Sequence, residues 1–152
     1  MIEVMVDEGL NVSFSQEMVE NVVKTSCFEA RSIRNPSVCI RFATHDVVKQ
    51  LNAEWRNQDK VTDVLSFPMQ EAGSLDASEN LGDMILAMPF VRDEAKRLDV
   101  TEDAHIYHLI AHSTLHLLGY DHMNDEEAEQ MQRLENTIML KLGLHKPYPE
   151  WS

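Results

Sequence analysis

The feature that most constrains this chain is a group of histidines. Several of them can lie on one face of a helix, and another follows in the loop after that helix. Five of the seven histidines lie between positions 105 and 122. His112 and His116 are four residues apart, so on a helix one lies above the other. Gly119 follows, and because glycine readily adopts the left-handed conformation that ends helices, it predicts a reversal of the chain. His122 then returns from the loop toward the same pair.

Two histidines from one helical turn and a third from the loop beyond it are typical of a catalytic zinc site. Three neutral imidazoles leave one tetrahedral position open for water, and zinc lowers the pKa of such a water toward about 7. The sequence therefore predicts a metal site at His112, His116 and His122. On a helix His108 lies about 12 Å from His116, too far to share an ion whose bonds measure about 2 Å. For His105 and His108 we expect packing or hydrogen bonds near the helix start, or a supporting role beside the metal or substrate.

The spacing matches the HExxHxxGxxH pattern of metzincin-type zinc proteases at every position but one. Position 113 is serine, where those proteases have the glutamate that acts as general base on the water. Ser113 cannot do this work, because a serine hydroxyl is not basic. A zinc hydrolase that acts on a peptide or a small amide stays an alternative, but its general base is missing from position 113. His45 and His145 are isolated in the sequence, and we expect both at the surface.

Periodic segments place this motif in an α+β fold. Apolar residues alternate at 38, 40 and 42, which predicts a strand, and they recur at helical spacing after capping residues at 13–16, 44, 101 and 124. The expected order is β-α-β-α-β-β-α-α-α. We therefore predict a single domain over residues 1–152, in which a small mixed four-stranded sheet packs against about five helices, one of them a zincin-like metal-site helix.

Composition and charge narrow the functional classes. The chain has 152 residues, 43% of them hydrophobic and 26% charged, as in ordinary globular proteins. It has no run of about 18 apolar residues that could cross a membrane, and its N-terminus lacks the basic start of a signal peptide. Cys27 and Cys39 form no CxxC pair, which favours a reduced, cytoplasmic protein.

The net charge of −13 disfavours a nucleic-acid partner. The first sixty residues, however, carry nine acids and seven bases, so nearly all the excess negative charge lies C-terminal. A local basic face is therefore possible in the first part of the chain. Its candidate residues are Arg31, Arg34, Arg41, Lys49, Arg56 and Lys60.

Three blocks of this sequence together resemble one known family. They are the run from His112 to His122, similar to HGxLHLxGYDH; Leu51-Asn52 through Arg56 to the TDVLSFP of residues 62–68; and Leu81-Gly82-Asp83. In order and spacing they resemble the bacterial YbeY proteins, which are metal-dependent endoribonucleases of ribosomal RNA maturation. The resemblance spans roughly the middle half of the chain. Ser113 stands where that family usually has glycine, and its side chain could narrow the site or add a hydroxyl near the metal-bound water.

The resemblance implies a zinc-like ion on His112, His116 and His122, and a functional arginine at Arg56. It also implies action in 16S ribosomal RNA 3′-end maturation and ribosome quality control, with ribosomal RNA, the small ribosomal subunit and its associated factors as partners. A guanidinium can hold phosphate oxygens by two hydrogen bonds, although Arg56 could equally cap a helix C-terminus at the surface. Three imidazoles also suit nickel, copper or cobalt.

Two questions stay open from the sequence. The general base could be metal hydroxide, a histidine near the helix start, or the 2′-hydroxyl of the RNA itself. A non-catalytic ribosome-assembly factor with a structural metal is a further alternative, and in that case substitution of Arg56 would leave function unchanged.

Overall fold

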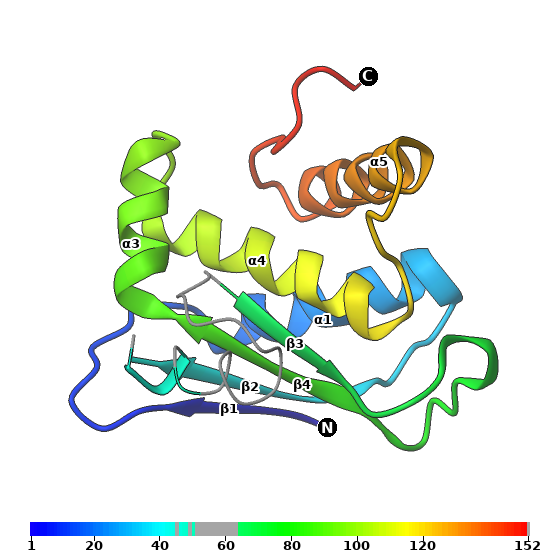
Figure 1. Cartoon of the computed structure of the whole chain (residues 1–152), viewed down its shortest axis with the longest axis horizontal. Coiled ribbons are helices and arrows are strands. Elements are labelled where there is room, and N and C mark those ends of the chain that lie inside the picture. Colours follow the sequence, from blue (N-terminus) through cyan, green and yellow to red (C-terminus); the bar gives the residue numbers. More distant parts are fainter. Residues whose placement is uncertain (45, 49, 51–63, 152) are drawn as a thin grey trace.

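The computed structural model describes residues 1–44, 46–48, 50 and 64–151. Its centre is one mixed sheet with the strand order β1-β2-β4-β3 (Figure 1). β1 (Ile2–Val6), β2 (Ser37–Ala43) and β4 (Asn80–Ala87) run parallel, and β3 (Val64–Pro68) pairs antiparallel with β4 at the edge. A short 3₁₀ helix, η1 (Ala72–Ser74), lies between β3 and β4.

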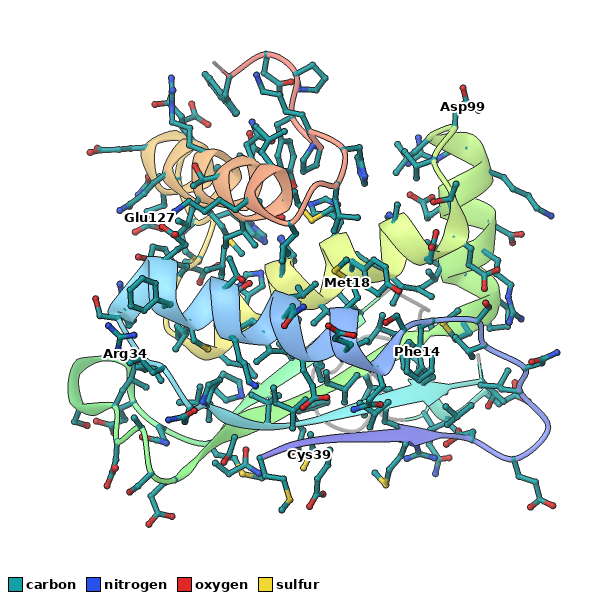
Figure 2. All side chains as sticks on the ribbon, turned by 180° about the vertical axis from the view of Figure 1, so that it is seen from behind. Phe14, Met18, Arg34, Cys39, Asp99 and Glu127 are labelled. Atoms are coloured by element: carbon teal, nitrogen blue, oxygen red, sulfur yellow. The ribbon has the colours of Figure 1, made fainter. Side chains whose placement is uncertain are left out.

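The alternating pattern of β2 places its apolar side chains on one face of the sheet. Val38, Ile40 and Phe42 are buried there. Figure 2 shows Cys39 beyond the strands, on the side turned away from α1 (Gln16–Arg31). Phe14, just before α1, stacks on Phe42 with ring centroids 4.9 Å apart. The buried face of β2 therefore belongs to the side of the sheet against which the helices pack.

Three helices begin after a residue whose side chain accepts a hydrogen bond from a free backbone amide of the first turn. The side chain of Ser15 caps α1, that of Thr101 caps α4 (Glu102–Leu117), and that of Asn124 caps α5 (Asp125–Lys141). α3 (Met88–Arg97) has Pro89 in its first turn, where a missing amide hydrogen does no harm. In Figure 1, α1 and α4 lie on one face of the sheet, α5 covers α4 from the far side, and α3 stands at one end.

α4 is the central helix of the molecule. It contacts β3, β4, α1, α3 and α5, and Ile106, Ile110 and Leu115 are fully buried. A helix enclosed on most sides is apolar on most sides, and three polar residues of α4, His105, Ser113 and Thr114, are buried with its apolar ones. The histidines of α4 are therefore fixed by packing on several sides.

Gly82 explains the close approach of the edge strand to the end of α4. It has a φ of 150°, and a Cβ there would lie 2.4 Å from the carbonyl oxygen of Phe67 and 2.7 Å from Leu117 Cδ2. Only glycine fits this contact without displacing backbone. The Leu81-Gly82-Asp83 block thus lets β4 support the helix turn that carries His116.

The structure confirms the predicted α+β fold, its mixed four-stranded sheet and the order of its elements. Residues 46–48 are helical, as expected after Thr44, while the rest of that expected helix lies outside the described residues. Within the described part of the chain, no helix has both the length and the apolar composition that a membrane crossing requires.

Candidate metal centre

The corner after α4 forms as its glycine predicts. Gly119 adopts a φ of 100°, and its amide donates a hydrogen bond to the carbonyl of His116 at 3.0 Å. The amide of Tyr120 donates to the carbonyl of Leu115, also at 3.0 Å. These bonds satisfy the last carbonyls of α4 and turn the chain back. His122 is thereby brought beside the helix it has just left.

The structure brings His112, His116 and His122 together. Nε2 of His112 and Nε2 of His116 are 3.1 Å apart. Each of the three side chains offers one ring nitrogen, and these nitrogens all lie within 4.8 Å of one another. The ring centroids of His116 and His122 are 5.3 Å apart. His122 is exposed, so the cluster opens toward solvent on the side of the loop.

The outward nitrogens of the two helical histidines are already occupied. Nδ1 of His116 lies 3.0 Å from the carbonyl oxygen of Tyr120, and Nδ1 of His112 lies 3.0 Å from Oε1 of Glu135. A carbonyl and a carboxylate only accept, so both Nδ1 atoms carry the hydrogen. In the neutral rings the two Nε2 atoms then face each other as lone pairs. A divalent cation between them fits this arrangement of donors.

The protonation state of His116 suits a ligand. Burial lowers the pKa of its ring from 6.5 to about 4, with a further contribution from His112, although the hydrogen bond to Tyr120 works in the opposite direction. His116 is therefore neutral at pH 7. A neutral imidazole presents the lone pair that a metal ion requires.

Glu135 is the residue of this site that sequence reasoning missed. It lies on α5 and is only 1% exposed. Burial alone would raise the pKa of its carboxyl group, but hydrogen bonds from His108 and His112 outweigh burial and lower the pKa from 4.5 to about 2. Glu135 is therefore ionised at pH 7. A signal was present in the sequence, because Glu135 lies on the same helical stripe as Met131 and Ile138.

His108 donates from Nε2 to Glu135 Oε1 at 2.8 Å, and a hydrogen bond of His108 near the start of its helix was one of the roles expected for it. His145 differs from expectation, because it is half-buried rather than at the surface. The ring of His145 packs edge-on against that of His108, with centroids 6.2 Å apart. Burial lowers the pKa of His145, and the proximity of His108 lowers it further. The C-terminal segment folds back over α4, and local sequence patterns do not report such long-range contacts.

A cavity of about 420 Å³ adjoins the cluster on the side of α3 and the C-terminal segment. Its wall includes His108, the predicted ligand His112, Lys146 and Tyr148. Aromatic rings, the cation of Lys146 and the carboxylate of Glu94 thus line the space next to the candidate metal position.

The serine at position 113 has a hydrogen-bond partner on the edge strand of the sheet. Its side chain is fully buried, and its Oγ lies 2.6 Å from Oγ of Ser66 on β3. The hydroxyl therefore ties the metal helix to the sheet edge. Ser66, which follows the strand pattern in the sequence, supplies the partner.

We expect Ser113→Gly to lower the free energy of unfolding by about 1–2 kcal/mol, since a mid-helix glycine and a lost buried hydrogen bond each cost about 1 kcal/mol. Zinc affinity should stay at the wild-type value, because the hydroxyl is engaged with Ser66. Urea unfolding and a zinc titration of both proteins measure the two quantities. Altered zinc affinity at unchanged stability would show that the hydroxyl acts at the metal position.

Arg31 at the end of α1 contacts the turn that follows α4. Its guanidinium donates to the hydroxyl of Tyr120 at 2.7 Å and to the carbonyl of Leu118 at 3.4 Å, and it lies 4.4 Å from the centroid of the Tyr120 ring. Because the carbonyl of Tyr120 fixes His116, this contact links α1 to the cluster. Arg56 and His45, named in the sequence analysis, lie outside the described residues.

Comparison with known proteins shows which family this chain resembles along most of its length. A family model described as endoribonuclease YbeY matches residues 5–143. A Sinorhizobium medicae protein named endoribonuclease YbeY is 42% identical over 144 residues, which cover 90% of this chain and 83% of the relative. An Acinetobacter baylyi protein of the same name is 38% identical over 144 residues, covering 92% and 91%. The solution structure of a Thermotoga maritima protein shares the fold, with a TM-score of 0.57 and 22% identity over 97% of this chain and 98% of that one.

Proposed function

This chain belongs to the endoribonuclease YbeY family, and on that premise we propose that it is a zinc-dependent endoribonuclease whose ion is held by His112, His116 and His122. The observation that carries the proposal is the convergence of three imidazole nitrogens within 4.8 Å, two of them with their opposite nitrogens already hydrogen-bonded. Nickel, copper and cobalt suit the same three nitrogens. We propose zinc because three histidines are a common catalytic zinc set.

The bound ion would supply Lewis-acid stabilisation for the charge that develops on the scissile phosphate. The chain's own residues hold the ligands ready for it. Nδ1 of His116 donates to the carbonyl of Tyr120, and Nδ1 of His112 donates to the carboxylate of Glu135. Arg56 is proposed to bind phosphate oxygens through two hydrogen bonds and to balance their charge.

As substrate we propose ribosomal RNA at the 3′ end of the 16S species, with the small ribosomal subunit and its factors as partners. The net charge of −13 means that RNA must bind through a local basic face. Such binding weakens steeply with salt, because each phosphate contact releases counterions. We also propose that residues 1–152 form one catalytic domain that acts in the cytoplasm, in keeping with the free cysteines Cys27 and Cys39.

The alternative of a peptide or small-amide hydrolase is less well supported. Position 113 offers a hydroxyl bonded to Ser66, and not the glutamate on which zinc peptidases depend. The alternative of a non-catalytic assembly factor predicts that the metal is structural and that its removal unfolds the chain.

The test uses zinc-loaded protein, chelator-treated protein and chelator-treated protein with zinc restored, each incubated with single-stranded RNA and with a peptide library. We expect RNA cleavage only in the two zinc-containing samples, at unchanged fold by circular dichroism. Intact RNA in all three samples would refute the endoribonuclease. Zinc-dependent peptide cleavage would replace it with the peptidase.

A further inference from the structure

One buried carboxylate serves two histidines of α4. Oε1 of Glu135 lies 2.8 Å from Nε2 of His108 and 3.0 Å from Nδ1 of His112. The side chain of Glu135 is 1% exposed, whereas that of His112 is 24% exposed. A fully buried acceptor on α5 therefore holds a histidine that reaches the rim of the site on α4.

The contact selects one form of the His112 ring. A neutral imidazole carries its hydrogen on either Nδ1 or Nε2, and only the Nδ1–H form can donate to Glu135. That form leaves the lone pair on Nε2, the atom 3.1 Å from Nε2 of His116. With the hydrogen on Nε2, the ring could not ligate through that atom and would lose its bond to the carboxylate.

The C-terminal segment covers this contact. Asn136, the neighbour of Glu135 on α5, donates from Nδ2 to the carbonyl of Tyr148 at 2.8 Å and accepts from the amide of Tyr148 at 2.9 Å. The hydroxyl of Tyr148 lies 3.4 Å from Oε1 of Glu135, and its ring centroid is 5.6 Å from that of His108. Enclosure of this kind excludes water and strengthens the hydrogen bonds inside it.

From these contacts we propose that Glu135 is the positioning residue of the metal centre, which holds His112 in the orientation and Nδ1–H tautomer that ligation requires. The inference rests on the metal site of the proposed function. Histidine ligands are commonly oriented by a carboxylate on the opposite ring nitrogen. Here that carboxylate comes from α5, outside the histidine motif, so the site is completed only when α5 and the C-terminal segment dock on α4.

The first test replaces Glu135 by glutamine, which has the same shape but offers a neutral oxygen to two N–H donors. We expect Glu135→Gln to lower zinc affinity about 10- to 100-fold, the range measured when such supporting partners are removed. The matched control is Glu129→Gln, the same change on the same helix at a carboxylate that is 45% exposed and paired with Arg133. It should bind zinc like the wild type. Zinc competition against a chelating dye, without RNA, gives these affinities.

The second test reads the tautomer directly in metal-free wild-type protein. Long-range nitrogen–proton NMR of the imidazole rings should show His112 with its hydrogen on Nδ1, and Glu135→Gln should raise the Nε2–H population. Wild-type zinc affinity in the folded Glu135→Gln variant, or an Nε2–H tautomer at His112 in the wild type, would overturn the inference. Absence of zinc binding by the wild type would instead refute the metal site of the proposed function, and the tautomer would still decide the role of Glu135.

Discussion

His116→Ala should abolish both zinc binding and RNA cleavage. It removes the central ligand of the cluster, whose Nε2 lies 3.1 Å from that of His112. Loss of the ion removes several kcal/mol of transition-state stabilisation, which corresponds to a rate loss on the order of a thousand-fold. Single-turnover cleavage of a labelled RNA and metal analysis of the purified variant measure the two effects.

Two further variants make that result interpretable. His122→Ala removes a ligand from an exposed loop position, so it should abolish zinc binding and cleavage with little loss of packing. His45→Ala removes a histidine far from the motif in the sequence and should leave both properties unchanged. Cleavage at the wild-type rate by either ligand variant, in nuclease-free preparations, would remove the main support for catalysis at this cluster.

Arg56→Glu should reduce RNA cleavage by about 10²- to 10³-fold, the effect typical of removing one group that stabilises developing charge. Zinc affinity and melting temperature should remain at their wild-type values, because the proposed role of Arg56 is toward phosphate alone. Cleavage rates, a zinc titration and thermal unfolding provide the comparison.

Lys96→Glu on α3 is the matched control for Arg56→Glu, since it makes the same change of charge at an exposed position. It should cleave RNA at close to the wild-type rate. Equal losses in the two variants would indicate a general effect of net charge. RNA cleavage by Arg56→Glu at the wild-type rate would show that Arg56 takes no part in catalysis.

The parts of the fold that could be predicted are those encoded by local signals. Thr101 and Gly119 delimit α4 through a cap and a left-handed turn, and the alternation around Ile40 marks β2. The order of the sheet was not accessible in this way, because the pairing of β1 with β2 and of β2 with β4 joins strands that other elements separate in the chain. Such contacts follow from packing of the whole chain.

The candidate site also contains residues that local signals predict and contacts that depend on the packing of the whole chain. The three histidines were predictable because two lie one helical turn apart and the third follows a glycine corner. The contacts of Glu135 and Tyr148 with α4 were not predictable, since they form only through the docking of α5 and the C-terminal segment. A carboxylate on an otherwise apolar helical stripe is the pattern that would have indicated Glu135, because a buried charge requires a partner.

The most direct test of the metal centre is anomalous diffraction at the zinc edge from crystals of the zinc-loaded protein. The account predicts one strong peak per chain, about 2 Å from Nε2 of His112 and of His116 and from one ring nitrogen of His122. A zinc-loaded crystal with no peak among these three rings, or with a peak that leaves His122 turned away from the ion, would contradict it.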